Sequence, residues 1–123
     1  MLDTTKYKDY RFTDDFNCAD FARMVASDNG IHYPIGGVNH NSNSVVAGAI
    51  AENRTAFERV NEPRDFDLIY MKESGGRRHI GLYFNRGKIY HLKRDGSPVF
   101  QKITAELKGS IIGFYRLKDI DNA

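Results

Sequence analysis

The sequence predicts one α+β domain, spanning residues 1–123, in which an N-terminal helix packs on an antiparallel β-sheet. The chain has 123 residues, which suits one domain and is too short for two ordinary ones. Apolar residues recur with helical spacing in the first half of the chain, and short apolar runs with the period of strands follow Pro63. Helices followed by a series of strands are typical of the α+β class.

The first helix is predicted to begin near Thr13-Asp14-Asp15, whose side-chain oxygens suit an N-cap. Asn29-Gly30 is expected to end it, because glycine readily takes a positive φ. A second helix is expected from about residue 43 to an end between residues 52 and 59. One face of the first helix is marked by side chains at i, i+3, i+4 and i+7, namely Cys18, Phe21, Ala22 and Val25.

A β-hairpin is the central feature of the predicted sheet. Asn85-Arg86-Gly87 is expected to form its three-residue loop, with Gly87 in the left-handed position. Phe84 then faces Lys88, and the same register places Gly81 opposite His91. The turn before the hairpin is predicted at residues 73–76, and the strands at residues 67–71, 79–84, 88–92, 99–103 and 111–117.

Composition argues against several functional classes. A formal net charge of +2 without a dense Lys/Arg tract gives little support to nucleic-acid binding, so no nucleic-acid partner is expected. The longest apolar stretch, residues 45–51, falls far short of the roughly 20 residues that span a bilayer, so no membrane insertion is expected. Residues 1–6 lack the apolar core of a signal peptide, which predicts synthesis in the cytoplasm without a Sec signal. The single cysteine excludes an intrachain disulfide.

Cys18 is the candidate nucleophile. It lies in the first turn of the predicted helix, where unpaired N–H groups and the helix dipole favour a thiolate over a thiol. The thiolate is the reactive form of cysteine. The alternative for a lone cysteine is a small residue on the apolar face of its helix.

His79 and His91 favour the nucleophile interpretation of Cys18, because the predicted register makes them diagonal neighbours on one face of the hairpin. Diagonal pairs lie about 7–8 Å apart at the backbone, so one imidazole can orient the other. Nucleophile, base and orienting group form the arrangement of a catalytic triad. Gly81 between the histidines is expected to leave open space for a substrate or for the helix that carries Cys18. Each histidine alone also suits an ordinary strand position, and a Cys–His–His zinc site remains an alternative without the close ligand spacing of zinc motifs.

Several segments carry a family resemblance. The cysteine helix FNCADFARMV (16–25), the following NGIHYP (29–34), the turn and strand PRDFDLIY (63–70), the hairpin HIGLYF (79–84) through Gly87 to Tyr90-His91, and the closing IGFYR (112–116) resemble the NlpC/P60 cysteine peptidases, with a likeness to the bacteriophage tail-associated branch. The chain order Cys, His, His argues against the circularly permuted relatives. Asn17 replaces the Asp that many members carry before the cysteine, and Ala19-Asp20 replaces a small residue followed by Gly.

The resemblance implies a papain-like core and a set of roles. Cys18 would be the nucleophile, His79 the base, and His91, twelve positions later, the residue that orients it. The oxyanion would be held by the Cys18 backbone N–H together with Tyr7 or Tyr10. The candidates for substrate binding are Asn17, Asp20 and Gly81. No metal and no cofactor is expected.

The resemblance also implies an activity and a setting. It predicts an endopeptidase that hydrolyses amide bonds in peptidoglycan stem peptides, as a phage or prophage tail-tip component acting at the host cell wall during genome entry. Other tail proteins would then be partners. Two alternatives remain: a structural tail or tail-assembly protein with little activity, and an acyltransferase or deamidase that uses the same Cys–His dyad.

Overall fold

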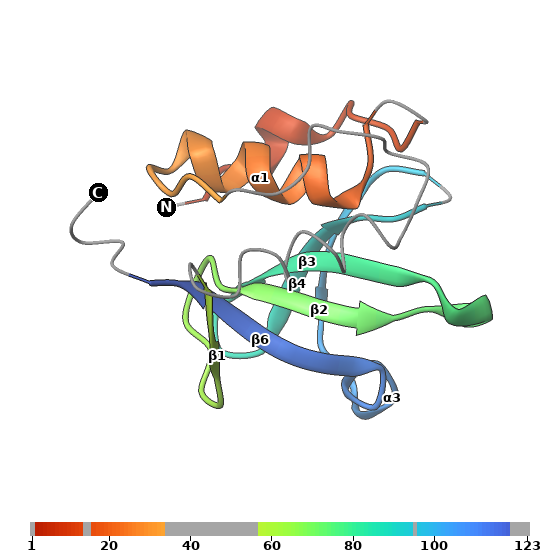
Figure 1. Ribbon diagram of the computed structural model, residues 1–123. Coiled ribbons are helices and arrows are strands. Elements are labelled where there is room, and N and C mark those ends of the chain that lie inside the picture. Colours follow the sequence, from red (N-terminus) through yellow and green to blue (C-terminus); the bar gives the residue numbers. More distant parts are fainter. Residues whose placement is uncertain (1, 14–15, 34–56, 95, 119–123) are drawn as a thin grey trace.

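The computed structural model describes residues 2–13, 16–33, 57–94 and 96–118. The elements along these residues are η1 (Thr4–Tyr7), α1 (Cys18–Asp28), β1 (Phe57–Val60), β2 (Leu68–Lys72), η2 (Ser74–Gly76), β3 (Arg78–Phe84), β4 (Lys88–Leu92), β5 (Pro98–Lys102), α3 (Ala105–Lys108) and β6 (Ile111–Leu117). The strands form one antiparallel sheet in the order β1-β6-β2-β3-β4-β5. Helix α1 lies over one face of this sheet (Figure 1). The predicted α+β class is therefore confirmed.

Helix α1 begins at Cys18, later than the sequence suggested. Its N-cap is Asn17, so the prediction of a start at Thr13-Asp14-Asp15 is wrong. Thr13 instead forms an isolated antiparallel bridge with Phe16. The end is as predicted, since Asn29 caps the helix and Gly30 follows with a φ of 89°. The later start makes Cys18 the first residue of the helix.

The sheet is packed on both faces. The apolar side of α1, with Phe21 and Val25 fully buried, packs against the face formed by Ile80, Leu82 and Tyr90. A smaller cluster on the other face contains Ile69, Met71 and Ile89, with half-buried side chains from α3 and β6 against it. Burial of the larger cluster holds the N-terminal end of α1 on β3, the strand that carries His79.

The β3–β4 hairpin has the predicted register. Leu82 pairs with Tyr90 and Phe84 with Lys88. Gly87 has the positive φ that was predicted, 130°, and Asn85 and Arg86 before it also take positive φ, 50° and 60°, which was not predicted. Two successive residues with positive φ make a turn whose twist matches that of the strands, and Asn is among the residues that tolerate it.

Strand β1 was not predicted from the sequence. It has four residues, pairs with β6 at the edge of the sheet, and buries one of its side chains, Phe57. So short a strand gives too little alternation to detect. The predicted second helix lies mostly at residues outside the described ranges, and the strand at 57–60 shows that a helix reaching Arg59 is wrong.

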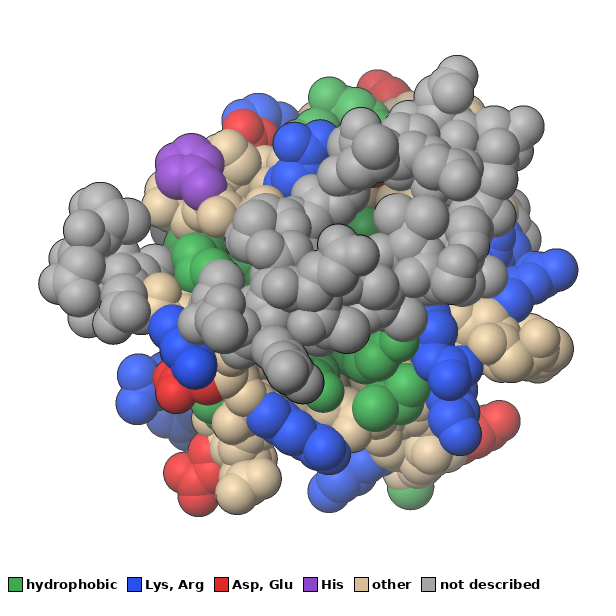
Figure 2. Space-filling model, viewed as in Figure 1, with side chains coloured by type: hydrophobic (Ala, Val, Ile, Leu, Met, Phe, Trp, Pro, Cys, Tyr) green, Lys and Arg blue, Asp and Glu red, His purple; other side chains and the backbone are tan. Residues whose placement is uncertain are grey.

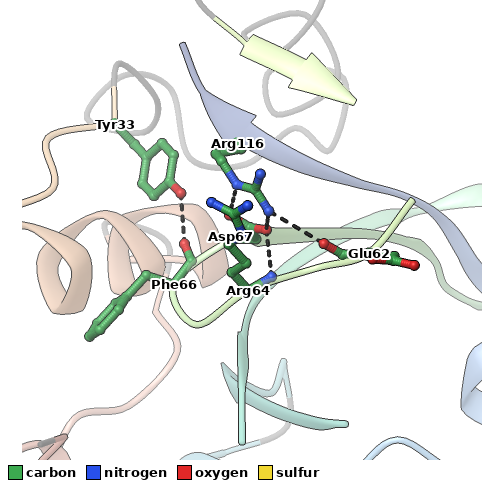
Figure 3. Close-up of polar contacts among 6 residues, drawn as sticks. All are labelled: Tyr33, Glu62, Arg64, Phe66, Asp67 and Arg116. Atoms are coloured by element: carbon green, nitrogen blue, oxygen red, sulfur yellow. Dashed lines mark hydrogen bonds and ion pairs between the residues drawn. The ribbon is translucent and has the colours of Figure 1, made fainter. Parts of the chain in front are cut away.

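A partly buried ion pair joins Asp67, the residue before β2, to Arg116 on β6. Arg116 donates from Nε and Nη2 to the two carboxylate oxygens of Asp67, at 3.0 and 2.7 Å (Figure 3). The Arg64 backbone N–H donates to the same carboxylate at 2.7 Å. Beside it, the Tyr33 hydroxyl donates to the Phe66 carbonyl at 2.6 Å. These contacts fix the turn that leads into β2 and connect it to the segment after α1.

Replacement of Asp67 by Ala is expected to lower the free energy of unfolding by about 3 kcal/mol, because it leaves the Arg116 charge without its buried partner. Urea denaturation measures this change. Lys6→Ala is the matched control, since it breaks the exposed Lys6–Asp28 pair, where the expected loss is below about 1 kcal/mol. Equal losses in the two variants would contradict the structural role given to Asp67.

Candidate active site

The cysteine is fixed by the cap of its own helix. The Asn17 side-chain oxygen accepts hydrogen bonds from the backbone N–H groups of Ala19 and Asp20, at 3.0 and 3.1 Å. The Asp20 carboxylate accepts the Asn17 backbone N–H at 3.0 Å, which completes a capping box. Asn17 and Asp20 are both buried. Their prediction as substrate-binding residues is therefore corrected: their side chains cap the helix and position Cys18.

The sulfur of Cys18 is directed at the start of β3. Its side chain is only 2% exposed, and the backbone N–H of Ile80 donates a hydrogen bond to it. Ile80 follows His79 directly in the strand. The charges of Glu73 and Arg94 also act on the thiol. The structure thus brings Cys18 to the strand residue next to the predicted base.

The two histidines are in direct contact. Nε2 of His79 lies 2.6 Å from Nδ1 of His91, and the rings meet edge to face. Both side chains are buried. The predicted diagonal contact between them is confirmed. Because Nε2 of His79 is engaged by His91, Nδ1 is the nitrogen left for proton exchange, and it has no hydrogen-bond partner among the residues that the structure describes.

Gly81 does not open the site as predicted. A Cβ added there would lie 2.6 Å from the Ile89 side chain and 3.1 Å from Cβ of His91. Ile89 therefore fills the space above the glycine. The prediction that Gly81 binds substrate is wrong. The glycine is needed for close packing of β4 side chains over β3.

Sequence reasoning missed three polar residues of the site. Gln101 Oε1 lies 2.9 Å from Nε2 of His91, and the predicted strand alternation alone would have placed it near the histidine face. Glu73, just before η2, lies with one oxygen 3.8 Å from Nδ1 of His79 and with the other 3.7 Å from Nε of Arg94. Glu73 and Arg94 lie in the connections that follow β2 and β4, where no periodic pattern marks them.

A cavity adjoins Glu73, the residue whose carboxylate lies 3.8 Å from Nδ1 of His79. Its volume is about 460 Å³, and its lining is polar with three basic side chains: the residues are Lys72, Glu73, Ser74, Arg77, Arg94 and Ser110. On the face shown in Figure 2, Lys and Arg side chains are found at several separate places on the surface. The cavity therefore gathers cationic groups beside the candidate base.

The two tyrosines proposed for the oxyanion lie in different places. The Tyr7 hydroxyl donates to Asp28 at 2.7 Å, at the far end of α1, about 15 Å of helix away from Cys18. Tyr7 is therefore wrong as an oxyanion donor. The Tyr10 ring stacks on Phe16, two residues before the cysteine, and is 41% exposed. Tyr10 and the Cys18 backbone N–H stay predictions.

Burial sets the protonation state of the site. Desolvation raises the pKa of the Cys18 thiol to about 11, and the hydrogen bond from Ile80 opposes this increase without cancelling it. Desolvation, followed by the effect of His91, lowers the pKa of His79 to about 3. Both shifts favour the neutral forms, a thiol and an imidazole, and so oppose the thiolate that was expected at the helix start.

No family model matches the chain, and no curated protein matches it. Across residues 2–13, 16–33, 57–94 and 96–118, no group of three or more His, Cys, Asp and Glu side chains is arranged to hold a metal ion. In the same ranges no helix has both the length and the apolar character needed to cross a bilayer.

Alkylation of Cys18 by iodoacetamide is expected to be slow at neutral pH and to rise steadily as the pH approaches about 11, because only the thiolate reacts and burial raises the thiol pKa. Mass spectrometry of the native protein over a pH series gives the rate. The urea-unfolded chain is the control, with a midpoint near that of a free thiol, about 8.5. A native midpoint at or below this control would refute the neutral thiol.

Proposed function

We propose that this chain is a cysteine endopeptidase of the NlpC/P60 type, with a papain-like core, that hydrolyses amide bonds in peptidoglycan stem peptides. The observation that carries the proposal is the position of the helix-start thiol of Cys18 beside the backbone of Ile80, the residue that follows His79, which is itself hydrogen-bonded to His91. Cys18, His79 and His91 come from α1, β3 and β4. The resemblance of the cysteine helix and the hairpin to that family supports the assignment.

The mechanism starts from neutral groups. Nδ1 of His79 takes the thiol proton as the sulfur of Cys18 attacks the amide carbonyl, so thiolate character develops only during attack. The Cys18 backbone N–H at the helix start donates to the resulting oxyanion. His79 then gives its proton to the leaving amine, and an acyl-enzyme remains. Water, deprotonated by His79, releases the acid and restores the thiol.

Two further contacts support the proton transfer. His91 holds His79 in place through the 2.6 Å contact. When His79 carries the proton, the Glu73 carboxylate at 3.8 Å from Nδ1 favours the imidazolium. The neutral resting pair therefore has an anion beside the site where positive charge develops.

The basic cavity supports an acidic peptide as substrate. Lys72, Arg77 and Arg94 line it beside Glu73. Ammonium and guanidinium groups bind carboxylates, which stem peptides carry on their γ-D-glutamyl and diaminopimelate residues. The likeness to the tail-associated branch supports a place in a phage or prophage tail tip, with other tail proteins as partners and the host cell wall as the site of action.

A structural tail protein with little activity is the second candidate. The observation that favours it is the closure of the site: Cys18 is 2% exposed, and Glu73 stands beside the free nitrogen of the base. Phage particles assembled with Cys18→Ala decide between the two. The enzymatic proposal requires impaired penetration of the cell wall, whereas normal infection by these particles would favour the structural candidate.

Purified protein is expected to release new amino groups from isolated peptidoglycan, and Cys18→Ala or His79→Ala is expected to lower kcat/KM by about 10⁴-fold or more, because nucleophile and base act as a unit. Mass spectrometry of the fragments identifies the bond cleaved and detects transfer to an acceptor other than water, the mark of an acyltransferase. His32→Ala is the matched control, since His32 contacts Ser27 near the far end of α1. Activity retained in Cys18→Ala would refute the proposal.

A further inference from the structure

A side chain outside the three proposed catalytic residues completes a chain of hydrogen bonds. Gln101 lies on β5, opposite Ile89 and diagonal to His91, which pairs with Val99. Its Oε1 lies 2.9 Å from Nε2 of His91, and Nδ1 of His91 lies 2.6 Å from Nε2 of His79. The order Gln101, His91, His79 therefore crosses three adjacent strands and ends at the residue before Ile80, whose backbone contacts the sulfur of Cys18.

We infer that Gln101 is a positioning residue that selects which nitrogen of His79 is free to act as the base. A carboxamide oxygen only accepts hydrogen bonds, so Nε2 of His91 must carry a proton. A neutral imidazole has a single N–H, which leaves Nδ1 of His91 as an acceptor. Nε2 of His79 must then be the donor in the 2.6 Å contact, and Nδ1 of His79 carries a lone pair.

The opposite arrangement would disable the base. If the amide nitrogen of Gln101 faced His91, each proton in the chain would move to the other ring nitrogen, and Nδ1 of His79 would carry a hydrogen. Such a nitrogen cannot accept the thiol proton. Glu73 does not impose that state, because its 3.8 Å distance from Nδ1 exceeds the length of a hydrogen bond.

The burial of both histidines makes the selection effective. Desolvation lowers the pKa of His79 and of His91, so each ring holds one proton at neutral pH and its tautomer is determined by its partners. The hydrogen bond that Gln101 accepts acts in the other direction on His91 and raises its pKa. The charge of Lys93 lowers the pKa of both rings, and that of Arg94 lowers the pKa of His79.

The test is the tautomeric state of the two rings, read from long-range proton–nitrogen correlation spectra of protein labelled with ¹⁵N-histidine. In the unaltered protein, both His79 and His91 are expected to carry their proton on Nε2. Signals are assigned from variants that lack each of the other histidines. A proton on Nδ1 of His79 in the unaltered protein would overturn the inference.

Variants of Gln101 then test whether its side-chain oxygen determines the tautomers of the two rings. Gln101→Glu keeps an acceptor and is expected to preserve both tautomers, whereas Gln101→Met removes it at similar length and is expected to give mixed tautomers in both rings. Lys102→Met, on the neighbouring exposed residue, is the control and should change neither ring. Retention of the single tautomer in folded Gln101→Met would overturn the inference.

The inference rests on the proposed function only for its kinetic consequence. In kcat/KM, Gln101→Met is expected to lose on the order of 10-fold, a part of the roughly 10²–10⁴-fold that a general base supplies, and Gln101→Glu is expected to recover most of it. The spectra test the tautomer inference and the assay tests the peptidase proposal, so either one can be refuted without the other. Tautomers as expected in an inactive protein would support the inference and refute the peptidase proposal, whereas activity with reversed tautomers would do the opposite.

Discussion

The packing of α1 against β3 and β4 is the constraint on which the candidate site depends. Phe21 and Val25 are buried against Ile80 and Tyr90, and full burial of each such side chain contributes about 1.5–3 kcal/mol. This contact decides where the helix begins relative to the strand. It places the sulfur of Cys18 beside the amide of Ile80, and the capping box holds the first turn in that position.

The same burial gives the site its electrostatic character. A helix N-terminus lowers the pKa of a thiol, and desolvation raises it; here desolvation is the larger effect. Two histidines in contact add to this, since a second charge beside the first is unfavourable and both rings favour the neutral state. Proton transfer during attack, rather than a preformed ion pair, is the chemistry that suits such a site.

The polar side chains of the site that contact one another lie on three adjacent strands of the sheet. His79, His91 and Gln101 lie on β3, β4 and β5, so the β3–β4 and β4–β5 registers together determine all three positions. Their shared face is closed by Ile89 over Gly81, which keeps water from the rings. The open region is instead the basic cavity beyond Glu73. Rigid strands thus hold the imidazoles, and a turn supplies the side chains that face solvent.

Local periodicity and a turn that sets strand pairing were enough to predict the α+β class, the end of α1, the hairpin register and the contact between His79 and His91. Which polar side chains face the site depends instead on how distant segments pack together. Asn17 and Asp20 satisfy backbone groups of the helix, Tyr7 bonds to Asp28, and Gln101 completes the histidine chain. Hydrogen-bond partners and desolvation depend on segments distant in the chain, and no spacing along the sequence records them.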